Sequence, residues 1–144
     1  MVAGKTDPGD LDLMTSSRML WAGRVLTALF ALFILAASVA PKLAGADVVA
    51  ETLSQLGWPT DFGLMLGVIE LMCLVLYLIP RTSVLGAVLM TAYLGGAMAT
   101  QVRVGSPLFT HQLFGIYLGV FMWGGLWLRD AKLRALFPFR APDK

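Results

Sequence analysis

The chain has 144 residues, of which 58% are hydrophobic and 14% are charged, and its mean hydropathy is +0.76. A soluble domain carries about 25% charged residues, so this chain has too few charges to cover a water-facing surface. The single cysteine excludes a disulfide framework, and a net charge of +2 gives no support to nucleic-acid binding. The composition is that of an integral membrane protein.

Four apolar segments are each long enough to cross a bilayer, which takes about 20 residues in a helix. They cover residues 20–40, 62–80, 82–102 and 112–128. None alternates in the manner of a barrel strand, and a helix satisfies its own backbone in lipid. The sequence therefore predicts an all-α membrane protein, a bundle of four transmembrane helices over residues 18–130.

The connections between these segments carry turn and capping residues. Pro80 ends the second segment and Ser83 can cap the third. In the longer first connection, a short helix is expected to start at Asp47, to stop at Gly57 and to lie on the membrane surface. We expect residues 1–17 to form a mobile tail and residues 131–144 an amphipathic segment at the cytoplasmic headgroups.

The distribution of positive charge predicts the orientation. Of the 11 Lys and Arg residues, only Lys42 and Arg103 fall in the first and third connections. The other nine lie on the N-terminal side (including Arg24, near the start of the first segment), in the second connection or in the C-terminal tail. This distribution places both termini in the cytoplasm, as expected for a multi-pass protein of a bacterial inner membrane. The alternative is a signal peptide cleaved after Ser38-Val39-Ala40, but more than 20 residues precede its apolar core.

Small residues predict how the helices pack, because helices in lipid associate through close van der Waals contact. The second and fourth segments have a GxxxG spacing, at Gly63/Gly67 and Gly115/Gly119. The third segment has two rows of small residues and is predicted to lie at the centre of the bundle. The rows are Ser83, Ala87, Thr91, Gly95 and Ala99, and Ala92, Gly96 and Thr100.

Glu70 is the most informative residue, because it lies near the middle of the second segment. A carboxylate at that depth is costly unless it is protonated or paired, and such residues usually face the bundle interior. We expect Glu70 to be buried on the Gly63/Gly67 face and largely protonated, because removal from water disfavours the charged form of a carboxyl group. Lys42 and Arg103 should lie too far away to pair with it. Its role is open between a structural hydrogen bond and ligand or proton handling. Candidate neighbours at the same depth are Thr27, Thr91, Tyr93 and Tyr117.

Other chemical groups are isolated in the sequence. Cys73 is the only cysteine and His111 the only histidine, so no metal or haem site is expected within one chain. Arg103 and His111 flank the third connection as polar residues of the outer surface. They are expected either to be solvated or to contact an anionic headgroup.

The sequence contains five short motifs, Pro41-Lys42-Leu43, Leu56-Gly57-Trp58-Pro59, Gly67-Val68-Ile69-Glu70-Leu71, Leu78-Ile79-Pro80-Arg81 and Thr91-Ala92-Tyr93-Leu94-Gly95-Gly96-Ala97. These motifs resemble those of the DoxX-like family of small four-helix bacterial membrane proteins. The resemblance covers roughly residues 18–130. The family takes its name from the small subunit of a thiosulfate:quinone oxidoreductase, and related members are associated with redox complexes, so the resemblance implies such a setting but carries over no catalytic residues.

Three functions remain open at this stage. The favoured one is a non-catalytic accessory subunit of a membrane complex, redox or quinone-linked. The second is a binder or carrier of a small hydrophobic ligand, such as quinone or lipid, in a pocket around Glu70. The third is an enzyme that uses Glu70 as acid or base, which an unpartnered carboxyl group makes the weakest. Expected partners are membrane lipids and either a membrane-complex subunit or a second copy of the chain.

Overall fold

The computed structural model describes residues 8–136, and their side chains from residue 16 onward. Every regular element in this part of the chain is helical, which confirms the all-α class. The elements are α1 (Pro8–Ile34), η1 (Leu35–Val39), α2 (Ala40–Leu43), α3 (Asp47–Gln55), α4 (Phe62–Leu78), α5 (Ser83–Arg103), η2 (Leu108–Gln112), α6 (Phe114–Arg129) and α7 (Ala131–Leu136).

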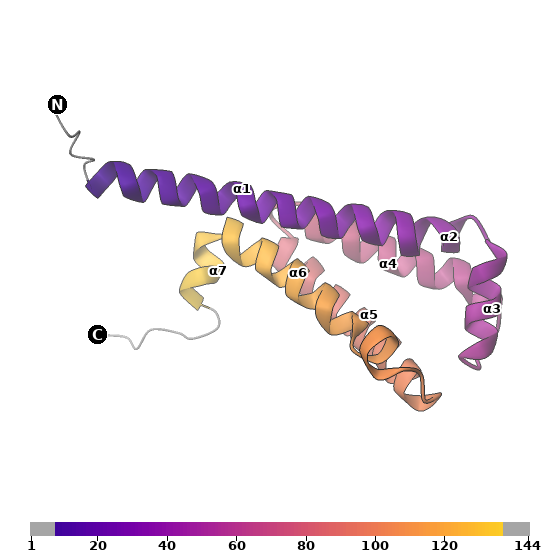
Figure 1. Ribbon diagram of the computed structural model, residues 1–144. Coiled ribbons are helices and arrows are strands. Elements are labelled where there is room, and N and C mark those ends of the chain that lie inside the picture. Colours follow the sequence, from indigo (N-terminus) through magenta and orange to yellow (C-terminus); the bar gives the residue numbers. More distant parts are fainter. Residues whose placement is uncertain (1–7, 137–144) are drawn as a thin grey trace, which may run out of the picture.

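The first three elements form one continuous rod (Figure 1). Within it η1 is π-helical, and the Ala40 N–H bonds to the carbonyl of Leu35, five residues back. Pro41 has no N–H, and its ring crowds the carbonyl of the residue four positions earlier, so a wider turn before it lets the helix continue. The rod therefore ends at Leu43 instead of residue 40, and Lys42 belongs to a helix.

The beginning of the rod includes part of the segment that the sequence predicts as a mobile tail. Residues 8–17 are helical, because α1 begins at Pro8, and proline is well tolerated in the first turn of a helix. Residues 1–7 of that expected tail lie outside the described residues.

Two of the described helices are long and apolar enough to cross a membrane, Ser16–Leu43 and Ser83–Arg103. The apolar helix α4 is shorter, at 17 residues. Large apolar side chains nevertheless point outward from all four long helices, for example Leu32, Leu64, Leu85 and Val120. An exposed apolar surface of this extent is typical of a protein that contacts lipid.

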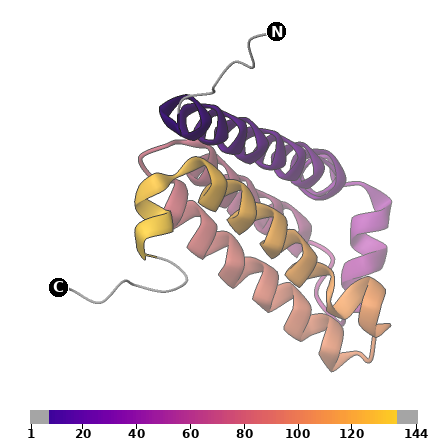
Figure 2. The same ribbon diagram turned by 60° about the vertical axis from the view of Figure 1, so that its left-hand side comes forward.

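The four long helices lie side by side, as Figure 2 shows. α1 contacts α6, α6 contacts α5, α5 contacts α4, and α4 contacts η1 and α2. The expectation that the third segment is central is therefore wrong. α5 has neighbours on two sides, but so do α1, α4 and α6.

Close contacts occur at three of the predicted glycines, Gly63, Gly67 and Gly115. They also occur at glycines that the sequence analysis did not single out. A Cβ on Gly86 would collide with the backbone of Tyr77, and a Cβ on Gly125 would lie 2.9 Å from Oγ1 of Thr27. A Cβ on Gly95, Gly96 or Gly119 would meet nothing within 4 Å. The small-residue rows of α5 are thus packed near Ser83 and Ala87, which are buried, but face open space farther along the helix.

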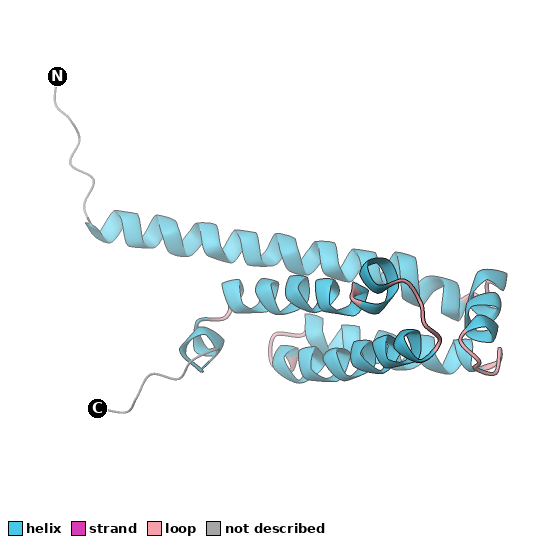
Figure 3. Cartoon of the chain, turned by 60° about the horizontal axis from the view of Figure 1, so that its bottom comes forward, coloured by secondary structure: helices cyan, strands magenta, loops and turns pink. Residues whose placement is uncertain are grey.

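The helix α3 lies across one end of the bundle, while the start of α1 and α7 lie at the other end (Figures 1 and 3). The predicted helix from Asp47 is confirmed, and it ends at Gln55 ahead of Gly57, whose φ is +72°. Arg103 at the end of α5 donates a hydrogen bond to the carbonyl of Leu56. This bond ties α5 to the segment that follows α3.

The first part of the C-terminal segment, α7, packs against the bundle. Asp130 accepts hydrogen bonds from the N–H groups of Lys132 and Leu133, at 2.9 and 3.1 Å, and so caps α7. Leu133 is buried, which anchors α7 to the core. The rest of the expected amphipathic segment, residues 137–144, lies outside the described residues.

Candidate binding site

Glu70 lies in the middle of α4 and is 1% exposed. It shares the buried face of α4 with Gly63, Gly67, Cys73 and Tyr77. The prediction that Glu70 is buried on the glycine face is therefore confirmed.

The carboxyl group of Glu70 is held by three side chains. Ser38 Oγ lies 2.8 Å from Oε1 and 2.9 Å from Oε2, Lys42 Nζ lies 2.7 Å from Oε2, and Tyr93 Oη lies 3.4 Å from Oε2. Lys42 Nζ also donates to Ser38 Oγ at 2.6 Å. The three partners come from η1, α2 and α5, so the cluster joins three separate helical segments to α4.

The prediction that Lys42 is too far from Glu70 is wrong. It assumed that the first helix ends before Lys42, whereas the rod continues through α2 and packs against α4. A Cβ on Gly67 would lie 2.8 Å from Cβ of Lys42, so the absence of a side chain at Gly67 lets the rod approach. The long lysine side chain then extends along the helices to the carboxylate.

Lys42 supplies a cationic partner at Glu70, where burial alone predicts a protonated carboxyl group. The 2.7 Å separation is that of a salt bridge, and the side chain of Glu70 is 2% exposed against 18% for Lys42. A carboxyl group in an apolar interior is tolerated when it is either protonated or paired with a cation. The structure provides the partner for pairing.

Of the four predicted neighbours of Glu70, only Tyr93 contacts it. Thr27 Oγ1 instead lies 3.2 Å from Tyr77 Oη, and Tyr77 donates to the carbonyl of Met122. Thr91 donates to the carbonyl of Ala87 and accepts from Trp123 Nε1. Tyr117 is 43% exposed and lies in a hollow between α1 and α6. Thr27 therefore lies about two helical turns from Glu70 along α4, and sequence reasoning could not tell which way the other side chains point.

Sequence reasoning missed two residues of the site, Ser38 and Lys42. The usable signal was the i, i+4 spacing of these two residues, which puts them on one face of a continuing helix. Proline at position 41 obscured that signal, because a proline usually marks the end of a helix.

The two polar residues expected at the outer surface lie at the α3 end of the molecule but do not meet in one site. Arg103 bonds to the carbonyl of Leu56. His111, in η2, has its Nδ1 2.8 Å from Thr110 Oγ1. Neither residue contacts Glu70 or its partners.

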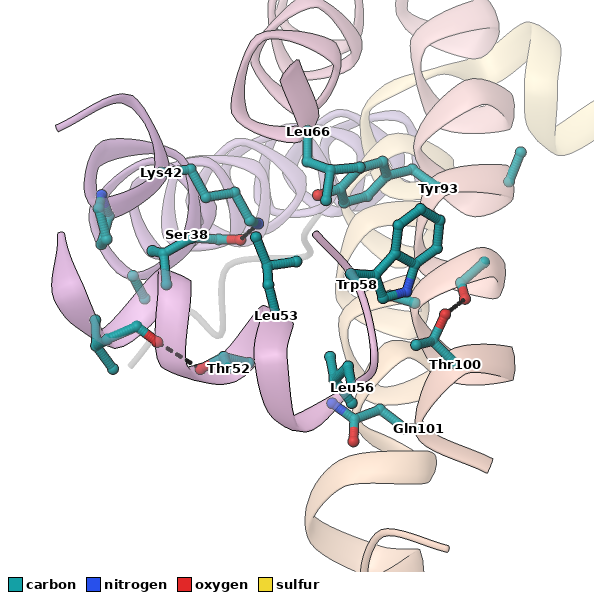
Figure 4. A pocket seen from close by; sticks show the side chains of 17 residues that line it. Ser38, Lys42, Thr52, Leu53, Leu56, Trp58, Leu66, Tyr93, Thr100 and Gln101 are labelled. Carbon is teal, nitrogen blue, oxygen red and sulfur yellow. Dashed lines mark hydrogen bonds between the residues drawn. The ribbon is translucent and has the colours of Figure 1, made fainter. Parts of the chain in front are cut away.

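Beside the Glu70 cluster lies a cavity of about 510 Å³. Figure 4 shows Lys42 and Ser38 on one side of it, Tyr93 and Trp58 on the opposite side, and Leu53 of α3 between them, with Leu56, the residue after α3, below. Pockets that hold small ligands typically measure about 300–1,000 Å³ and are mostly apolar with a few polar groups. The lining comprises Ala37, Ser38, Pro41, Lys42, Val48, Val49, Thr52, Leu53, Leu56, Trp58, Leu66, Ala92, Tyr93, Gly96, Ala97, Thr100 and Gln101.

The cavity exists because α5 has small residues where it faces α3. Gly96 has open space around it, and Ala92 and Ala97 flank it in the lining. The helix α3 closes the other side, because Val49 and Leu53 pack against Gly63 of α4, at 3.0 and 3.6 Å from a Cβ placed there. The second row of small residues in α5 therefore lines the cavity instead of making a helix contact.

A model of the DoxX-like family matches residues 25–125 of this sequence. The chain belongs to the DoxX-like family. No curated protein and no solved structure gives a match to it. All residues of the Glu70 cluster and of the cavity lie within the matched range.

Four of the five motifs that resemble the DoxX-like family meet around this cavity. Pro41 and Lys42 come from the first, Leu56 and Trp58 from the second, and Ala92, Tyr93, Gly96 and Ala97 from the last. The motif around Glu70 supplies the carboxylate behind Lys42. The segments that most resemble the family are thus far apart in the sequence but adjacent in the fold.

Proposed function

We propose that this DoxX-like protein binds a small, mostly apolar molecule within the membrane, in the cavity between α3 and α5. The observation that carries the proposal is the 510 Å³ cavity with a buried ion pair at its side. Quinone and lipid are both candidate ligands, because each combines an apolar body with a polar head. Glu70 does not line the cavity, which favours binding over acid–base catalysis by this residue.

The ion pair is better explained by ligand binding than by stability alone. Taking two charges out of water costs several kcal/mol per ion, and a buried pair often contributes no more than apolar residues of the same volume. Ionisable residues inside a membrane are rare and commonly mark a functional site. The side chain of Lys42 keeps 18% of its surface accessible and lines the cavity, so its charge remains available to a ligand.

The proposal includes a topology of four membrane spans with both termini in the cytoplasm. Two observations support it. Nine of the 11 Lys and Arg residues fall on one side of such a topology, and the start of α1 lies at the same end of the bundle as α7 (Figure 3). In this arrangement α3 rests at the outer interface of the inner membrane and covers the cavity.

Filling the cavity tests the binding function. In a Gly96→Phe variant the new side chain has room, because a Cβ on Gly96 meets nothing within 4 Å, and it should occupy the cavity that Gly96 lines. Gly124→Phe is the matched control, because Gly124 is equally open and lies in α6, outside the cavity lining.

The measurement is mass spectrometry of small molecules extracted from protein purified in mild detergent. We expect an apolar compound to co-purify with the wild-type protein and with Gly124→Phe, at a level at least ten times that in Gly96→Phe. Equal recovery from all three proteins, or an empty wild-type protein, would contradict the binding function.

A second candidate function is the accessory subunit of a membrane complex, redox or quinone-linked. It is favoured by a groove of about 390 Å³ between α5 and α6, whose lining includes Gly95, Gly115 and Gly119. Small residues let a transmembrane helix of another subunit approach closely. A stoichiometric partner should be recovered from native membranes with the wild-type chain and lost in Gly95→Leu/Gly119→Leu, while Gly124→Leu retains it. Recovery of the chain alone would count against this role.

A further inference from the structure

We propose that the cavity selects an uncharged molecule with a hydrogen-bond-accepting oxygen, such as a ketone carbonyl, on an apolar body, and that Lys42 holds that oxygen. The inference rests on the proposed binding function and specifies the chemistry of its ligand. It follows from the charge balance of the site and from the hydrogen-bond donors that the site leaves unused.

The charges beside the cavity balance each other. Lys42 and Glu70 form a salt bridge, so their charges cancel before any ligand arrives. Lys42 is the only charged residue that lines the cavity within the described part of the chain. An anionic ligand would bring an unbalanced negative charge next to Glu70, and a cationic one would meet the ammonium of Lys42. A buried unpaired charge is costly, so the site favours a neutral molecule.

The ammonium group of Lys42 has one more hydrogen-bond donor than it uses within residues 16–136. An ammonium group has three N–H donors. Two are donated, to Ser38 Oγ at 2.6 Å and to Glu70 Oε2 at 2.7 Å. The third has no acceptor within residues 16–136, so a ligand oxygen can complete the set.

The other polar side chains that line the cavity also favour a ligand that accepts hydrogen bonds. The hydroxyl protons of Ser38, Thr52 and Thr100 are already donated, to Glu70 and to the carbonyls of Val48 and Gly96. The amide oxygen of Gln101 accepts from Ser106. The N–H groups left over belong to Lys42, to the indole of Trp58 and to the amide of Gln101, and an accepting oxygen suits each of them.

The ammonium group of Lys42 lies near the aromatic side of the cavity. Its Nζ lies 5.6 Å from the ring centroid of Tyr93, and Figure 4 shows Trp58 on the same side of the cavity as Tyr93. A flat apolar body can pack between these rings and Leu53 while its oxygen reaches the ammonium. Partial desolvation of the ammonium strengthens such a hydrogen bond relative to one in water.

Three probes of nearly equal shape test the inference in detergent. They are 2-acetylnaphthalene, which has a carbonyl oxygen, 2-ethylnaphthalene, which has no acceptor, and 2-naphthoate, which is an anion. Binding is measured by isothermal titration, and the signal of the Gly96→Phe variant is subtracted to remove partition into micelles. We expect the ketone to bind about ten-fold more tightly than the hydrocarbon, the difference of one hydrogen bond of about 1.4 kcal/mol, and more tightly than the carboxylate.

A variant pair assigns the selectivity to Lys42. Lys42→Met/Glu70→Gln removes both charges, keeps the side-chain volumes and leaves an amide to bond with Ser38 and Tyr93. In this double variant the ketone and the hydrocarbon should bind equally. Lys42→Arg, which keeps the charge and the donors, should retain at least part of the ketone preference.

The outcomes separate this inference from the binding function on which it rests. If the hydrocarbon binds as tightly as the ketone, or the carboxylate binds most tightly, the cavity is a binding site and the inferred ligand chemistry is wrong. If no probe gives a signal beyond that of Gly96→Phe, the binding function itself fails. A ketone preference that survives in Lys42→Met/Glu70→Gln would remove Lys42 from the explanation.

Discussion

At the scale of the residue, the length of the lysine side chain decides the chemistry of the site. Four methylene groups separate the charge of Lys42 from its backbone, and such a side chain can lie along an apolar surface while its ammonium sits elsewhere. Here the ammonium turns inward, to a carboxylate that is 1% exposed. The sequence places Lys42 in a connection between helices, but the charge of Lys42 pairs with a buried carboxylate.

Breaking the pair from one side should cost much more stability than removing it altogether. Lys42→Met leaves the carboxyl group of Glu70 buried without its cation, and we expect a loss of about 3 kcal/mol in the free energy of unfolding. Lys42→Met/Glu70→Gln should stay within about 1 kcal/mol of the wild type, because no isolated charge remains. Unfolding by dodecyl sulfate in mixed micelles, followed by circular dichroism, measures both values.

Equal stability losses in the single and double variants would mean that the site contributes through packing instead of charge. Glu70→Gln alone provides the control, because it keeps hydrogen-bond partners for Ser38 and Tyr93 while removing the negative charge beside Lys42. That variant should be the less stable of the two variants that carry Gln at position 70.

At the scale of the element, one π-helical segment and one glycine bring the rod onto α4. The wider turn of η1 precedes Pro41 and lets the helix run on to Leu43. Single π-turns within α-helices are frequent at functional sites, and this one includes Ser38. Opposite η1 and α2, Gly67 removes the side chain that would hold the rod away from α4.

Two glycine-to-alanine substitutions should therefore change stability in opposite directions. At Gly67 the added Cβ would lie 2.8 Å from Cβ of Lys42 and 3.3 Å from a methyl group of Leu43, so the rod must shift, at a cost of about 1–3 kcal/mol. At Gly119 the added Cβ meets nothing within 4 Å, and alanine should stabilise the helix by about 0.5–1 kcal/mol. Both variants are compared in the same dodecyl sulfate titration.

The Gly67→Ala variant should also weaken ligand binding, because it displaces Lys42 from Glu70, while Gly119→Ala leaves binding unchanged. A stabilised Gly67→Ala protein would show that the close approach of α2 to α4 is not needed for the fold.

At the scale of the whole molecule, the ends of the helix bundle differ in how tightly they are packed. Around Tyr77 the helices are close: Gly86 and Gly125 leave no room for a Cβ, and Tyr77 bonds to the carbonyl of Met122. Toward α3 the glycines of α5 are open and the cavity appears. One end of the bundle is thus closely packed, and the other end contains the cavity.

The proposed topology predicts which ends of the molecule can be reached from outside the cell. In a Cys73→Ala background, Thr110→Cys in η2 should react with a membrane-impermeant maleimide on intact cells, and Lys132→Cys in α7 should react only after the cells are opened. Both positions are exposed in the structure. Labelling of position 132 on intact cells would overturn the orientation, and the Cys73→Ala chain alone gives the background.

The sequence by itself determined the membrane class, the positions of the apolar segments, the helix after Asp47 and the burial of Glu70. These features depend on composition, on periodicity and on the cost of a carboxylate in lipid, and each can be judged within one segment. The glycine face of α4 was predicted for the same reason, because positions 63, 67 and 70 lie on one side of any regular helix.

Only the tertiary structure decided which residues meet. The pairing of Lys42 with Glu70 depends on a π-turn that carries a helix past a proline, and on an approach of two helices that one missing side chain permits. The cavity depends on helices that touch near Tyr77 and leave open space near Gly96. Such rotations and separations of whole helices are set by all their contacts at once, and no single segment of the chain encodes them.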